Sequence, residues 1–348
     1  MKIKIPAPLI IISVSLIAYM IYVYSLGIDK VIETFKMISL TSLILLALSI
    51  FVAIFFHALA WHLILLGGGV DRQKVSFGEV FSIVSIALLS GYIIPVGAVT
   101  ELMRLVLTNK RLGLESSKTV STIMIHRVYV SSSAFLMIFI LLIARYIVLG
   151  KLNISFTELV IIIIYTLLVI IPNIGLTGFL GTGLFRKILG KIKSFLEEKY
   201  YKEKILFDPS YFVYEYKNTI KNIFLSKYSL LSFLASAGEW LFLTTSMYIL
   251  INSFMYGIGL LNAFIIALFI QLIYWIMPVS VSGLAGFMEF IITLALQVLG
   301  ISPYIAVSFA VTYRIVTFLV LLTVSYPMMK ILRIEDLRDL LRSSEKNS

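Results

Sequence analysis

Residues 40–66 read LTSLILLALSIFVAIFFHALAWHLILL, an apolar run that contains no Asp, Glu, Lys or Arg. A helix needs about 20 mainly apolar residues to cross the hydrocarbon core of a bilayer, so this stretch predicts a transmembrane helix. Five other stretches meet the same criterion, at 8–26, 119–144, 158–180, 228–252 and 303–327. The sequence therefore predicts an all-α polytopic membrane protein with six full transmembrane helices.

The composition agrees with this fold class. The 348 residues are 60% hydrophobic and 14% charged, with a mean hydropathy of +1.03, whereas soluble domains are about a quarter charged. The chain has no cysteine and three histidines, so we expect neither a metal site nor a cofactor. The net charge of +11 indicates an uneven distribution of basic residues across a membrane and not a nucleic-acid partner.

Two further apolar stretches, 80–100 and 260–299, contain helix breakers near their middle. Irregular backbone at membrane depth is tolerated only where protein buries it or where it lines a wet cavity. We therefore predict re-entrant hairpins or discontinuous helices, at about 80–104 and 260–299. Two ordinary proline-kinked spans, giving eight crossings, are the alternative. The predicted breaks are Gly91, Pro95, Gly97, Pro278, Gly283 and Gly286.

The basic residues orient the chain. With the N-terminus in the cytoplasm, 23 of the 29 lysines and arginines lie on the inner side and four on the outer side. Basic residues favour the cytoplasmic side, so we predict a cell-membrane protein with both termini inside. The basic segment 184–227 is then a cytoplasmic linker that lies on the membrane surface.

An internal repeat joins the two broken segments. Leu112-Gly113 and Arg127 recur 187 residues later as Leu299-Gly300 and Arg314. A proline opens each unit and a glutamate follows it, Glu101 in the first and Glu289 in the second. Because equivalent spans run in opposite directions, we predict inverted repeats at 1–150 and 151–327, followed by a cytoplasmic tail at 328–348. Inverted repeats that meet around broken helices are typical of alternating-access transporters.

Charges inside the spans are the main functional signal. Arg127 and Arg314 lie about 12 Å and about 17 Å into their helices at 1.5 Å per residue, and such arginines face a partner or a cavity. Guanidinium matches phosphate geometry, so both are candidate ligands of a lipid phosphate. Structural pairing, for instance of Arg314 with Glu289 or Glu239, is the alternative. The candidate coupling or ion-pair residues are Glu101, Glu239, Glu289, His126 and Tyr313.

Other polar residues carry weaker signals. His126 aligns with Tyr313 in the repeat, and a lone histidine beside an arginine is more typical of a hydrogen-bonded packing residue than of a proton relay. We assign no chemistry to His57 and His62, which flank Trp61. The glycines near 283 can expose helix N-terminal amides to an anion or simply permit close packing. The chain has no catalytic motif that we recognise, and we do not expect an enzyme.

These residues resemble a flippase-like family, the transmembrane region of lysylphosphatidylglycerol synthases, over about 8–327. The first unit matches at Pro95, Glu101, Arg104, Leu112-Gly113 and Arg127, and the second at Pro278, 282–286, Glu289, Leu299-Gly300 and Tyr313-Arg314. The resemblance adds Arg104 to the candidate phosphate ligands. The chain departs from the family pattern at Thr100 (usually Gly), Val281 (usually Pro) and Met288 (often basic). The resemblance implies the lipid-translocating half of such a protein without the soluble synthase domain.

The sequence thus favours a lipid translocator that moves a phosphate-bearing lipid or a lipid-linked sugar between leaflets. Its expected partners are membrane lipids, either an anionic phospholipid or a polyprenyl-linked glycolipid. Two alternatives stay open. One is a membrane-embedded lipid-modifying transferase that uses Glu101 or Glu289 as base. The other is a non-transporting partner of a separate lipid synthase or glycosyltransferase.

Overall fold

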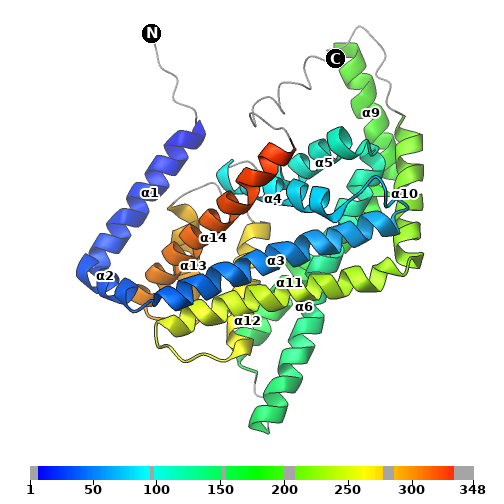
Figure 1. The fold of residues 1–348 in the computed structure, drawn as a ribbon. Helices are drawn as coiled ribbons and strands as arrows, with labels where there is room; N and C mark the ends of the chain where they lie inside the picture. The colour runs from blue at the N-terminus through cyan, green and yellow to red at the C-terminus, as the bar shows by residue number, and fades with distance from the viewer. Residues whose placement is uncertain (1–6, 95–97, 151–153, 200–207, 277–285, 333–348) are drawn as a thin grey trace, which may run out of the picture.

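The computed structural model describes residues 7–94, 98–150, 154–199, 208–276 and 286–332. Every regular element in these ranges is helical, as predicted (Figure 1). The elements are α1 (Ala7–Leu26), α2 (Ile28–Lys36), α3 (Leu40–Gly67), α4 (Phe77–Ile93), α5 (Val99–Leu112), α6 (Ser116–Leu149), α7 (Phe156–Tyr165), the π-helical turn η1 (Thr166–Ile170), α8 (Ile171–Leu180), α9 (Gly183–Lys199), α10 (Pro209–Leu225), α11 (Tyr228–Ser253), α12 (Leu260–Ile276), α13 (Phe287–Val298) and α14 (Pro303–Ile331).

Five helical stretches in the described ranges are long and apolar enough to cross a membrane, namely α3, α6, the continuous α7–η1–α8, α11 and α14. They coincide with five of the six predicted spans. The sixth prediction falls on α1, which meets the same criterion together with α2 across a bend of 88°. Gly27 lies at this bend with φ +98°, a conformation that glycine adopts without a steric penalty. The multi-pass character is confirmed, and the number of crossings stays a prediction.

Helices α3 and α11 form the most extensive helix pair and run side by side in opposite directions (Figure 1). The Ser232 hydroxyl donates to the Ala60 carbonyl at 3.1 Å. Farther along the pair, a Cβ added at Gly238 would lie 2.6 Å from the Phe56 ring. Small residues let transmembrane helices approach closely, so Gly238 sets the separation of this pair. The opposite directions agree with the sense predicted for 40–66 and 228–252.

The first broken segment is present as two helices, because α4 ends at Ile93 and α5 begins at Val99. The two helices pack against each other, and a Cβ added at Gly91 would lie 2.0 Å from Thr100 Oγ1. Gly91 was expected at the break itself. It lies instead in the last turn of α4, where its missing side chain lets α5 approach. The predicted breaks at Pro95 and Gly97 lie outside the described residues.

In the second predicted broken segment, α12 ends at Ile276 and α13 begins at Phe287. Pro278 and Gly283 lie outside the described residues. Gly286 precedes α13 with φ +86°, and a Cβ there would lie 2.5 Å from the Leu16 Cα of α1. Gly286 therefore serves both a left-handed backbone and a close contact with α1. Re-entry of either segment stays a prediction.

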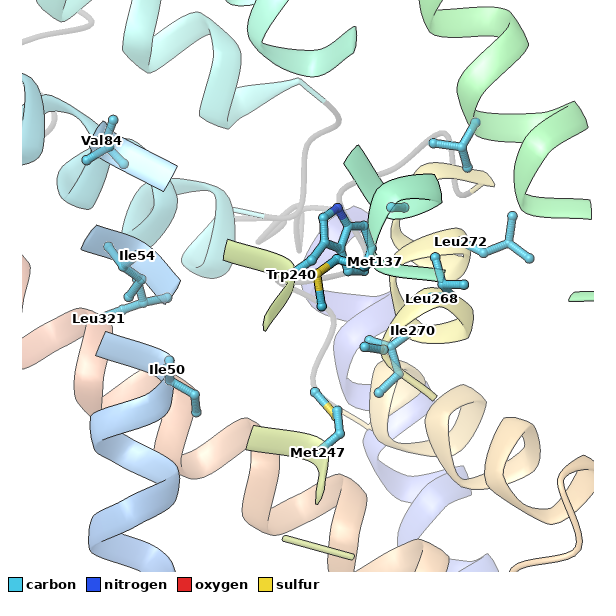
Figure 2. Packing of buried hydrophobic residues seen from close by; sticks show 14 of the residues in the cluster. Ile50, Ile54, Val84, Met137, Trp240, Met247, Leu268, Ile270, Leu272 and Leu321 are labelled. Carbon is cyan, nitrogen blue, oxygen red and sulfur yellow. The ribbon is translucent and has the colours of Figure 1, made fainter. Parts of the chain in front are cut away.

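Buried apolar side chains from most of the helices form one large cluster. Figure 2 shows part of it, with Ile54, Val84 and Leu321 from α3, α4 and α14 in one region. Met137, Trp240 and Leu268 from α6, α11 and α12 lie in another. This packing fixes the α3–α11 pair against α6, and these three helices carry much of the candidate site.

The predicted cytoplasmic linker 184–227 contains two different helices. Helix α10 packs on α6 and α3, and the Tyr216 hydroxyl donates to the Thr177 carbonyl at 2.9 Å. Helix α9 contacts α8 and α10 and carries apolar side chains that are exposed along one face, among them Leu184, Ile192 and Phe195. Helix α10 is thus packed on the other helices, whereas α9 has the amphipathic character expected of a helix that lies on a membrane surface.

Candidate functional site

The first charged cluster begins with Glu101, in the first turn of α5. Its carboxylate lies 3.3 Å from the Arg104 guanidinium and 3.6 Å from Nε of Arg127 on α6. Residues three apart share a helix face, so Glu101 and Arg104 point together toward α6. The Glu101 and Arg127 side chains are about one-quarter exposed, whereas Arg104 is 2% exposed. Glu101 therefore bridges one buried and one accessible arginine.

Arg104 is held from several sides. Its Cζ lies 4.0 Å from the centre of the Trp61 ring, a cation–π contact. Trp61 in turn donates to Thr122 Oγ1 at 3.3 Å. Arg104 also contacts His126 Nδ1 at 3.2 Å. A guanidinium has no acceptor, so His126 accepts at Nδ1, and the hydrogen of its neutral ring is on Nε2.

Helices α3 and α11 add a second carboxylate to this cluster. His57 Nδ1 lies 3.0 Å from Glu239 Oε1, and the His57 ring packs edge-on against the His126 ring, with 4.4 Å between centroids. The sequence pattern indicated no chemistry for His57. His57 precedes Trp61 by four residues, so both side chains lie on one face of α3. This spacing is the signal in the sequence that could have identified His57.

The second charged site joins α13 and α14. Arg314 Nε lies 2.7 Å from Glu289 Oε1, and both side chains are largely buried, at 12% and 11% exposed. The other Glu289 oxygen accepts from the Gly286 amide at 2.6 Å. Of the two partners considered for Arg314, Glu289 is thus the one that pairs with it, while Glu239 pairs with His57.

Tyr92 links this second site to the first broken segment. The Tyr92 ring lies 4.9 Å from Arg314 Cζ, and its hydroxyl donates to the Arg314 carbonyl at 3.0 Å. Tyr92 is in α4, so the second site contains a side chain from each half of the chain. Tyr313, a candidate coupling residue, packs on Phe309 with 6.1 Å between ring centroids.

The two sites share one design. In each, a glutamate on the short helix after a broken segment pairs with an arginine on the next long helix, as Glu101 with Arg127 and Glu289 with Arg314. Their surroundings differ, because Arg104, Trp61 and two histidines belong only to the first cluster. The arrangement offers guanidinium groups to an anion once a carboxylate withdraws.

Three side chains of the first cluster also have the composition of a transition-metal site. His57, His126 and Glu239 each offer a ligand atom within 4.8 Å of the others, as in His₂Glu zinc sites. The hydrogen bonding contradicts that use. Arg104 occupies His126 Nδ1 as a donor, and the remaining nitrogen then carries hydrogen and has no lone pair for a metal.

Long apolar helices with arginine–glutamate pairs inside their packed core define the class, a multi-pass α-helical membrane protein with charged sites among its helices. More particularly, the chain belongs to the lysylphosphatidylglycerol synthase TM region family, whose model matches residues 9–325. None of the curated proteins compared with the chain matches it. The family predicted from the motifs is thus confirmed.

Proposed function

We propose that the chain is a lipid translocator, which moves a phosphate-bearing lipid or a lipid-linked sugar between the leaflets of the cell membrane. The observation that carries the proposal is the paired arrangement of Glu101 with Arg127 and Glu289 with Arg314. Each carboxylate is on a short helix next to a broken segment and occupies the place that a phosphate would take. Movement of that helix would exchange one anion for the other.

The proposed roles of the arginines follow from their exposure. Arg127 is one-quarter exposed and can meet a lipid headgroup directly. Arg104 is buried against Trp61. In this proposal it positions Glu101 and His126 and contributes positive charge without touching the lipid. Arg314 is less exposed than Arg127 and would accept the phosphate at another stage of the cycle.

Alternating access between inverted repeats is the proposed mechanism. The repeats are 1–150 and 151–327, each ending in a long helix that carries the paired arginine. The opposite directions of α3 and α11 and the contact of Tyr92 with Arg314 support an interface between the halves at the sites. Binding sites at repeat interfaces, lined by broken helices, are typical of such transporters.

The proposal makes the chain a transporter and not an enzyme. Glu101 and Glu289 are the bases that a transferase would use, and each already forms an ion pair with an arginine at 3.6 Å or less. The family name points to anionic and aminoacylated phospholipids as substrates. A separately encoded lipid synthase or glycosyltransferase remains a proposed partner.

The test is a liposome assay with the purified chain and a panel of fluorescent lipids, including phosphatidylglycerol and a polyprenyl-phosphate glycolipid. We expect one of them to be exposed to the outer leaflet faster than in protein-free vesicles, and R127Q to abolish the gain. Arg145 provides a matched control, because it pairs with Glu158 at 3.4 Å and is equally exposed. R145Q should transport normally. Rates equal to protein-free vesicles for every lipid would contradict the proposal.

A further inference from the structure

A second carboxylate next to the arginine site has no role in phosphate exchange. Glu239 is 9% exposed and His126 is 1% exposed. Glu239 Oε2 and His126 Nε2 are buried and have no hydrogen-bond partner among the described residues. Buried polar atoms are nearly always satisfied, so two orphaned atoms in one cluster indicate that something binds or moves there.

Of the two histidines in this cluster, only His57 can take up a proton and keep its contacts. His57 donates from Nδ1 to Glu239 Oε1, which leaves its Nε2 as a lone-pair nitrogen. A proton added at Nε2 gives an imidazolium that keeps its contact with the Glu239 carboxylate. His126 has no such option, because Arg104 faces its Nδ1 and a second cation would be repelled.

The charges of the first cluster balance when both histidines are neutral. Arg104 and Arg127 oppose Glu101 and Glu239. When Glu101 leaves Arg127 it stays paired with Arg104 on α5. A lipid phosphodiester that takes its place at Arg127 therefore adds one uncompensated negative charge, and such a charge is costly away from water. One proton on His57 restores the balance.

We propose that the His57–Glu239 pair is a proton-binding site whose occupancy is coupled to lipid phosphate binding at Arg127. The proton comes from bulk water, forms the N–H bond at His57 Nε2 and is released when the lipid leaves. Coupling of this kind is reciprocal, so a proton also strengthens lipid binding, and a pH gradient can drive the lipid. The inference rests on the proposed function.

The other groups on the helices around the pair do not supply this proton. Arg104 and Arg127 are cations, Glu101 is held between them, and Tyr165 on α7 is a buried phenol. Arg314 on α14 is paired with Glu289. His62, five residues beyond His57 on α3, packs against Phe77 instead. The titratable and charged groups that interact electrostatically within this cluster, besides the pair itself, are Glu101, Arg104, His126, Arg127 and Tyr165.

The test is calorimetric titration of the full chain in detergent with dihexanoylphosphatidylglycerol, in two buffers of different ionisation enthalpy. We expect uptake of about one proton per lipid in the wild type. Because the coupling is reciprocal, lipid affinity should also fall as the pH is raised. H57N keeps a donor toward Glu239 but cannot take the proton, so it should bind with no uptake. H62N is the matched control and should behave as wild type.

The outcomes separate the two proposals. Lipid binding with no proton uptake in the wild type, which needs no variant, would overturn the proton site alone. Equal uptake in H57N would do the same. One equivalent of zinc that co-purifies with the wild type and is lost in H57N would replace the proton with a metal. No lipid binding, or unchanged binding in R127Q, would overturn the translocator proposal itself.

Discussion

The Arg314–Glu289 pair offers the sharpest separation of a structural role from a binding role. Its atoms are 2.7 Å apart and its side chains are 12% and 11% exposed, so R314Q leaves a carboxylate in a largely buried place. Removing one member of a buried pair costs about 3–5 kcal/mol. Losing the contact with Tyr92 adds about 1 kcal/mol. At about 2–4 °C per kcal/mol, we expect R314Q to melt at least about 8 °C below wild type.

Two further variants distinguish a structural role of Arg314 from a phosphate-binding role. R314K keeps the charge and loses the planar fork, so we expect it to fold and to lose most of its transport. The neutral double variant R314Q/E289Q removes both charges and should recover most of the melting temperature without recovering transport.

The assays are thermal unfolding in detergent and lipid exposure in liposomes, applied to the same preparations. A double variant that transports at the wild-type rate would reject phosphate binding at Arg314 and leave a purely structural pair. A melting temperature of R314Q equal to that of wild type would refute the reasoning about burial. We expect the same order of effects at Arg127, with a smaller loss of stability because its pair is more exposed.

Three further predictions follow from other parts of the chain. Single cysteines at Ser194 and Ser344 should resist impermeant thiol reagents in intact cells, because the distribution of basic residues predicts that both positions are cytoplasmic, and labelling from outside would overturn the predicted topology. Gly91→Ala should destabilise the chain by about 1–3 kcal/mol in thermal unfolding, since its Cβ would lie 2.0 Å from Thr100 Oγ1. Adding T100A should restore most of the loss, and no restoration would contradict the contact. W61L should lower the melting temperature by removing the ring under Arg104, worth about 2 kcal/mol when desolvated, and an unchanged value would refute that contribution.

The sequence was most informative where a local property decides the structure. The length and hydropathy of each apolar run determine whether it can cross a membrane, and five of the six predicted spans are long apolar helices. In 80–100, one helix ends at Ile93 and the next begins at Val99, near the predicted break. The motifs around Glu101, Arg127, Glu289 and Arg314 identified the family that the chain belongs to.

The fold decided which charged groups meet. Arg104 on Trp61, His57 with Glu239 and Tyr92 with Arg314 are all contacts between helices that are distant along the chain. An amphipathic helix shows which face it buries, but a membrane helix that is apolar all round does not. The rotation of α3, α11 and α14 about their axes is set by packing at residues such as Gly238, and so the partners of their buried polar side chains come only from the tertiary structure.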